Sequence, residues 1–243
     1  MHLVFVTWAI LFAFLAIAGA FIVLFVIVCL LEKVHLDDFV PAPGGEALTD
    51  SPYFAAMNDA AKRLGFVPAG VLIQSRGSRI YQAQIALWVS PEGDILLQIA
   101  GGKTAGVTVK RTILYSVLST NQILQTQDSA SVVDLSGLTD HKLLVHADLD
   151  ELLSCHRERL ASRLEGKRTF AAGTAYSDRQ SILRMRAEEM ERMGLVKFLN
   201  QRQTIYRYTF AGAWLQYQKG LRAQTAEAIS QADGNIRRRP GSI

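Results

Sequence analysis

The sequence contains little cysteine, with only Cys29 and Cys155 among its 243 residues. The two lie far apart in segments of different character, so a disulfide framework is excluded, and the scarcity mildly favours a reducing compartment. Charged residues make up 20% of the chain and aromatic residues 9%, which are ordinary proportions for a folded globular protein. The chain is long enough to be stabilised by a hydrophobic core instead of cross-links.

Spacings typical of catalytic or metal sites are also missing. The sequence contains no HxxxH, CxxC or HExxH, the patterns that fix metal ligands in place. His141, His146, Asp148 and His156 could supply ligands, but helical spacing places His156 on an apolar helix face and favours a hydrogen-bonded core histidine. Gly101-Gly102-Lys103-Thr104 lacks the earlier glycine of a P-loop and precedes a strand pattern. We therefore predict no catalytic, metal or cofactor site.

Residues 1–31 lack Asp, Glu, Lys and Arg altogether. About 20 apolar residues suffice to cross a bilayer as a helix, and no basic residue precedes the run as in a cleavable signal peptide. Residues 1–33 are therefore predicted to form an uncleaved, single-pass membrane anchor. Lys33 follows the run, and this charge bias predicts an outside N-terminus and a cytoplasmic C-terminal domain.

Within that segment, four alanines lie at spacings of four, three and four: Ala9, Ala13, Ala16 and Ala20. These spacings place them on one helix face, where small residues let two helices approach closely, so the stripe predicts a homodimer through this helix. Residues 34–50, which contain Pro41, Pro43, Gly44 and Gly45, are predicted to be an exposed linker.

The central part, residues 51–146, is predicted to be an α+β domain with an antiparallel sheet. Ser51-Pro52 is typical of a helix start, and Gly65 of a helix end. Ser90-Pro91-Glu92-Gly93 has the preferred residues of a type I turn between two stretches that alternate apolar and polar residues, which predicts a hairpin. Val132-Val133 and Leu143-Leu144-Val145 are predicted to be shorter, later strands. Helical patterns between the strands are missing, so we expect an antiparallel meander or small partly closed barrel with packed helices.

The C-terminal part is basic. Residues 1–154 contain 9 Lys and Arg against 14 Asp and Glu, a net charge of −5, whereas residues 155–243 contain 17 against 8, a net of +9. Residues 147–232 are predicted to form a helix–hairpin–helix region: Asp148 caps the first helix, Ser177 with Gln180 forms a capping box for the second, and Gly194 ends it. Residues 233–243 are predicted to be a disordered basic tail.

Residues 177–215 weakly resemble the end of a winged-helix DNA-binding domain. Glu191-Arg192-Met193-Gly194-Leu195-Val196, a polar turn, Tyr206-Arg207-Tyr208-Thr209 and Gly212 follow the order of recognition helix, wing and closing helix. The resemblance implies contacts to nucleic acid through five residues: Arg179, Arg184, Arg186, Lys197 and Arg202. Little room remains before Ser177 for the family's second helix, and three glutamates on the candidate recognition helix would repel phosphate.

Two functions follow from these patterns. The first is a non-enzymatic interaction or scaffolding module that faces the cytoplasm, with the lipid bilayer and an unknown protein as partners. The alternative is a membrane-tethered protein that binds nucleic acid through its basic C-terminal part. The same basic charges could instead contact anionic lipid headgroups or the acidic half of the chain itself.

Overall fold

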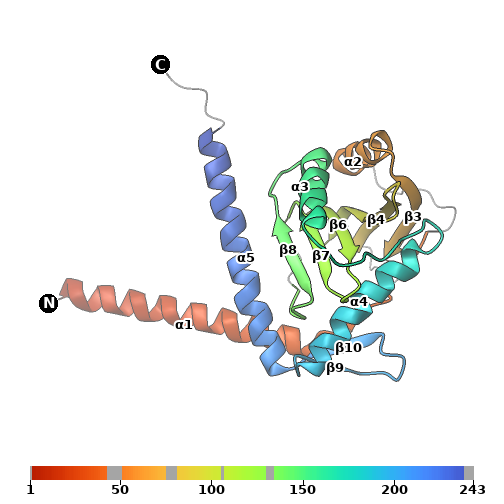
Figure 1. Cartoon of the computed structure of the whole chain (residues 1–243). Helices are drawn as coiled ribbons and strands as arrows, with labels where there is room; N and C mark the ends of the chain where they lie inside the picture. Colours follow the sequence, from red (N-terminus) through yellow and green to blue (C-terminus); the bar gives the residue numbers. More distant parts are fainter. Residues whose placement is uncertain (1, 43–50, 75–80, 105–106, 130–133, 238–243) are drawn as a thin grey trace, which may run out of the picture.

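The computed structural model describes residues 2–42, 51–74, 81–104, 107–129 and 134–237 and has an α+β fold (Figure 1). Its helices are α1 (His2–Leu31), α2 (Pro52–Arg63), α3 (Leu149–Ala161), α4 (Ala175–Arg192) and α5 (Phe210–Arg237). Its strands are β1 (Val34–His35), β2 (Phe39–Pro41), β3 (Val67–Gln74), β4 (Tyr81–Val89), β5 (Leu96–Thr104), β6 (Val107–Val117), β7 (Ile123–Gln127), β8 (Thr139–Leu143), β9 (Val196–Phe198) and β10 (Ile205–Tyr208).

Seven strands form one open sheet in the order β2-β3-β4-β5-β6-β7-β8. Every neighbouring pair is antiparallel except β7 and β8, which run parallel. A second, three-stranded sheet has the order β1-β10-β9. The segment 34–41, expected to belong to a linker, thus contributes one strand to each sheet, and the rest of that prediction, at 43–50, lies outside the described residues.

Helices cover both faces of the seven-stranded sheet (Figure 1). On one face α2 and α3 pack against the sheet through Phe54, Leu152 and Leu160. On the other face α4 packs through Ala175 and Ile182, preceded by Phe170. Strand residues alternate between these two cores, as a pleated sheet with both faces covered requires.

The clearest sequence signals are confirmed. The hairpin of β4 and β5 turns at Pro91 and Gly93, and Gly93 has a φ of 74°, a value that glycine adopts without strain. The side chain of Asp148 caps α3 by accepting a hydrogen bond from Glu151 N. Pro52 opens α2 as predicted, although Ser51 makes no side-chain cap.

The predicted antiparallel meander or partly closed barrel is wrong, because the sheet is mixed and its order is that of an open sheet. A parallel pair needs a connection that returns the chain to the end where the first strand began. The connection between β7 and β8 makes this return, and in its described part Asp134 accepts hydrogen bonds from Ser136 N and the Thr139 hydroxyl. The expected strand at Val132-Val133 lies outside the described residues.

The predicted capping box at Ser177 is also wrong, because α4 begins earlier, at Ala175 after Thr174. Ser177 donates to the carbonyl oxygen of Thr174 instead, and Asp178 accepts from the Thr174 hydroxyl at 2.8 Å. Asp178 is fixed further by Arg168, 2.7 Å away. The Ser177 hydroxyl, which the sequence pattern assigned to a cap, is thus used inside the first turn of α4.

The predicted membrane anchor does not survive in this structure. In the part of the chain that the structure describes, no helix has both the length and the apolar character that crossing a membrane requires. The prediction of a single-pass protein anchored by residues 1–33 is therefore wrong, and with it the orientation built on that anchor, an outside N-terminus and a cytoplasmic C-terminal domain. The lipid bilayer as a partner stays a prediction. At its C-terminal end α1 instead takes part in tertiary packing, where Val26 and Cys29 are buried against Ala213 of α5.

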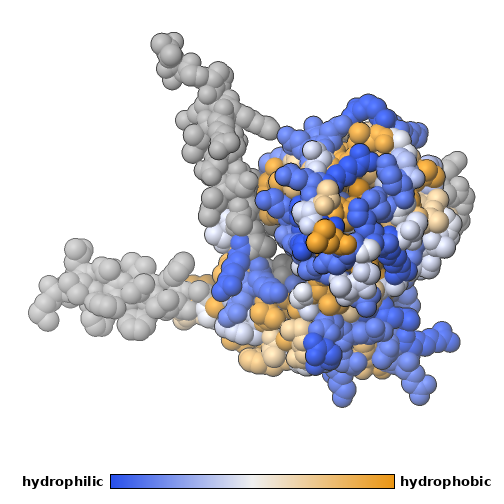
Figure 2. Space-filling view, in the orientation of Figure 1, coloured by the Kyte–Doolittle hydropathy of each residue, from blue (hydrophilic) through white to orange (hydrophobic). Residues whose placement is uncertain are grey.

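Apolar side chains also lie on the surface where α1 and α5 meet. Phe25 contacts Tyr217, which stacks on Trp214 at 5.6 Å between ring centroids. Figure 2 shows hydrophobic residues gathered at this junction, whereas hydrophilic residues cover much of the visible face of the seven-stranded body. Of the predicted self-association stripe, Ala16 and Ala20 are exposed, and the side chains of Ala9 and Ala13 lie outside the described part. Self-association through this stripe stays a prediction.

Candidate interaction site

A buried histidine fixes α3 on the sheet. His156 has no solvent-exposed surface, and its ring nitrogens lie 3.0 Å from Ser116 Oγ on β6 and 2.9 Å from Thr126 Oγ1 on β7. Burial, with the nearby Arg159 charge, lowers the pKa of His156 to about 3, because a charged imidazole loses its hydration there. The ring is therefore a neutral structural link, as its position on the apolar helix face predicted.

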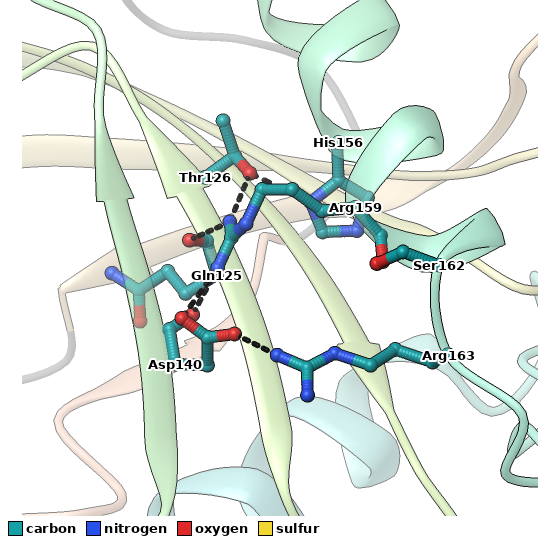
Figure 3. Close-up of polar contacts among 7 residues, drawn as sticks. All are labelled: Gln125, Thr126, Asp140, His156, Arg159, Ser162 and Arg163. Atoms are coloured by element: carbon teal, nitrogen blue, oxygen red, sulfur yellow. Dashed lines mark hydrogen bonds and ion pairs between the residues drawn. The ribbon is translucent and has the colours of Figure 1, made fainter.

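One turn further along α3, Arg159 extends across the sheet toward its edge (Figure 3). Its guanidinium donates to the Gln125 carbonyl and the Thr126 hydroxyl, both at 2.8 Å, and to the Asp140 carbonyl at 2.7 Å. It also forms an ion pair with the Asp140 carboxylate at 2.9 Å. One side chain thus joins α3, β7 and β8.

Asp140 is the corresponding anchor on β8. Its carboxylate accepts from Arg159 and from Arg163, so two arginines of the α3 region hold one residue of the edge strand (Figure 3). A half-buried pair of this kind is screened less than an exposed one. The network holds β8 in a defined position relative to α3.

The outer edge of β8 is unpaired among the described residues, because β8 is the last strand of the sheet. On the inner edge, Leu138 O accepts from Ile123 N and Leu144 N donates to Gln127 O. Backbone groups alternate in direction along a strand, so Thr139, His141 and Leu143 direct theirs away from β7. These groups form a template for a further strand.

A shallow groove of about 580 Å³ lies where the chain leaves β8 and enters α3. Its apolar side comes from the last residue of β8 and the segment that follows, with Leu143, Leu144, Val145 and Ala147. Its polar side comes from one stripe of α3, with Glu151, Ser154, Cys155 and Glu158. Leu143 is both the last residue of β8 and part of the groove lining, so the unpaired edge and the groove adjoin, and we call them together the β8 site.

Two of the residues predicted to contact nucleic acid face the sheet instead. Arg179 donates to Gln98 Oε1 at 3.1 Å and lies over the Phe39 ring. Arg186 donates to Gln125 Oε1 at 2.5 Å and pairs with Asp134 at 3.7 Å. Their exposed fractions are 8% and 5%, so neither can reach a phosphate backbone in this conformation.

The other three predicted nucleic-acid contacts are on the surface. Arg184 is exposed on α4, Lys197 on β9, and Arg202 in the turn between β9 and β10. Arg179 and Arg186 do not belong to this exposed group, because they lie on the buried side of α4, opposite Arg184. The structure therefore separates the five residues into a surface group and a buried group.

The histidines weighed as metal ligands do not converge. Both ring nitrogens of His156 are occupied by hydroxyl groups inside the core. His141 lies on the exposed strand β8, and Asp148 caps α3. Among the described residues no group of three or more His, Cys, Asp or Glu side chains is arranged to hold a metal ion.

Sequence patterns did not reveal the β8 site. A strand was expected at Leu143–Val145, but β8 spans Thr139–Leu143. Four of its five residues are polar, so the sequence shows no alternation of apolar and polar residues there. The buried arginines did leave a signal: Arg179, Ile182, Arg186 and Met190 lie at helical spacings of three, four and four and all are buried on α4.

Comparison with known proteins adds no assignment to this geometry. No protein-family model matches the chain, and neither curated proteins nor solved structures contain a match to it.

Proposed function

We propose that this chain is a non-catalytic protein-interaction module that binds an extended segment of another protein along the outer edge of β8. The single observation that carries the proposal is the unpaired edge of β8 continuing into a groove. An added strand would form main-chain hydrogen bonds with the edge and place alternate side chains in the groove. Affinity then comes from the backbone and specificity from the groove.

The residues around β8 hold the strand in place before any partner binds. Arg159 and Arg163 form ion pairs with Asp140. Because these contacts already fix β8, binding a partner does not require the strand to become ordered. A preformed surface lowers the entropic cost of association. His141 and Lys142 are exposed on the strand, and polar side chains of this kind discourage indiscriminate pairing at an edge.

Two clusters of polar side chains inside the fold support a non-catalytic function. The Ser116–His156 pair has the residue types of a nucleophile and its base, but neither residue has solvent-exposed surface. Tyr53, Thr112 and Asp128 form another closed cluster, in which Tyr53 donates to Asp128 at 2.5 Å. Burial raises the pKa of Asp128. In both clusters the polar groups satisfy one another.

The proposal is tested with His141→Pro in the full chain, because proline removes the outward N–H of the edge strand. The matched control is His141→Ala, which keeps the N–H and removes only the side chain. The probe is a set of synthetic decapeptides of alternating apolar and charged residues, titrated by fluorescence anisotropy. We expect at least one decapeptide to bind and His141→Pro to weaken it about tenfold or more, with His141→Ala close to wild type. Binding that is unchanged by the proline, or no binding by any decapeptide, would contradict the proposal.

A further inference from the structure

The β8 site has an electrostatic asymmetry that strand addition alone does not use. Its groove is lined by two carboxylates, Glu151 and Glu158, and by no lysine or arginine. Both glutamates are exposed, and neither has an ion-pair partner among the described residues. Nearby acids differ: Asp150 pairs with Arg63, and Asp140 with two arginines. The groove therefore has negative charge that the fold itself does not neutralise.

We infer that the segment bound at the β8 site is basic and apolar, with lysine or arginine side chains on Glu151 and Glu158 and an aliphatic side chain against Leu143, Leu144 and Val145. The inference rests on the proposed function and adds the chemistry of the partner. It commits to an extended polypeptide because the unpaired backbone groups of β8 adjoin the groove.

The spacing of the two carboxylates sets the spacing of the partner's charges. Glu151 and Glu158 are separated by two turns of α3, which corresponds to about 10 Å along the helix axis at about 1.5 Å per residue. Side chains on one face of a strand recur about every 7 Å. Basic residues two or four positions apart bracket the distance, and the flexible stem of a lysine covers the difference.

The apolar side of the groove adds selectivity of a second kind. Leu143, Leu144 and Val145 are each partly exposed, so an incoming aliphatic side chain would remove apolar surface of both partners from water. A peptide with the correct charges and only polar residues between them would lose this contribution. The expected motif is therefore a short alternation of basic and aliphatic residues.

Cys155 provides a direct reporter of occupancy. It lies in the groove wall between the two glutamates along α3 and is partly exposed, whereas Cys29 is buried. Alkylation of the native chain with iodoacetamide should therefore modify Cys155 preferentially. A peptide seated in the groove should slow that reaction, while one bound elsewhere should not.

The experiment compares two decapeptides with the same aliphatic residues, one alternating with lysine and the other with glutamate, on the full chain. We expect the lysine peptide to bind at least tenfold more tightly and to slow alkylation of Cys155. The double substitution Glu151→Gln with Glu158→Gln should weaken binding of the lysine peptide about tenfold. The control is Glu188→Gln, at an exposed glutamate on α4 for which the described residues supply no ion pair, and it should leave binding unchanged. Circular dichroism verifies that each variant is folded.

The outcomes separate this inference from the proposed function. Equal binding of both peptides, abolished by His141→Pro, would overturn the inference and keep strand addition. Lysine-peptide binding that is lost in the double glutamine variant but not in His141→Pro would keep the basic partner and overturn strand addition. Binding of neither peptide, or lysine-peptide binding that survives the double substitution, overturns the inference.

Discussion

At the scale of single residues, this fold keeps polar side chains inside by pairing them. His156 contacts two hydroxyls, and Arg186 contacts Gln125 and Asp134. The pairing of the two arginines is incomplete, because Arg179 Nη1 and Arg186 Nε are buried without a hydrogen-bond partner among the described residues. A buried polar group is costly when it is unpaired and nearly neutral when it is satisfied. The stability of the body should therefore depend on whether these groups keep their charge states.

His156 makes this dependence measurable through pH. Its folded pKa of about 3 lies below the ordinary value of 6.5, so between these values the unfolded chain binds the extra proton. The contribution is fully present above pH 6.5 and is lost as the pH falls toward 3, at up to about 1.4 kcal/mol per pH unit. We expect the stability advantage of wild type over His156→Gln to shrink by about 2 kcal/mol between pH 7.5 and 5. Urea unfolding at both pH values measures it, and an advantage that stays constant would contradict the prediction.

At the scale of elements, the entry into α5 is set by a close backbone approach. A Cβ on Gly212 would lie 1.9 Å from the carbonyl oxygen of Leu195. Thr209 precedes the helix, and its hydroxyl oxygen accepts from Gly212 N at 3.2 Å while also bonding to Leu195 O at 3.1 Å. The start of α5 is thus packed directly on the β9–β10 unit, with no room for a side chain.

Gly212→Ala should accordingly destabilise the chain by about 3 kcal/mol, because backbone atoms must move to admit the methyl group. The matched control is Gly220→Ala on the same helix, where nothing lies within 4 Å of the added Cβ. That substitution should stabilise by about 0.5 to 1 kcal/mol, since alanine favours a helix interior. Urea unfolding compares the two, and equal effects of both substitutions would show that the close approach is unimportant.

The elements also show what sequence can and cannot predict. The β4–β5 hairpin was predictable because Pro91 and Gly93 specify their turn locally. The parallel pairing of β8 was not predictable, because it depends on long-range placement of the strand beside β7 and not on a local turn. The groove was hidden for the same reason: Leu143 and Glu158 meet only after α3 packs on the sheet. An apolar run at 1–31 likewise carries no information about the contact between Val26 and Ala213.

At the scale of the whole molecule, the acidic and basic parts of the sequence lie against each other. Ion pairs link the basic part to the acidic part at Arg157–Glu92, Arg159–Asp140, Arg163–Asp140, Lys167–Asp94 and Arg186–Asp134. Five of the 17 basic residues in 155–243 are therefore directed at carboxylates of the acidic part. Internal complementarity, one of the alternatives that the sequence left open, accounts for these residues.

The sign of the salt dependence tests this complementarity. Exposed and half-exposed pairs contribute up to about 1 kcal/mol each and weaken as salt screens them. If attraction between the two parts dominates, raising NaCl from 0.02 to 0.5 M should lower the free energy of unfolding by about 1 to 2 kcal/mol. If repulsion within an unpaired basic surface dominates, the same change should stabilise the chain.

We expect the first result in urea titrations of the full chain, with a smaller salt effect in Asp140→Asn. That substitution removes the shared partner of Arg159 and Arg163, so there is less attraction left to screen. Glu188→Gln, at an exposed site with no ion pair among the described residues, should keep the wild-type salt dependence. Stability that rises with salt in wild type would mean that the basic part stands free of the acidic one, and that its charges are available to an external anion instead.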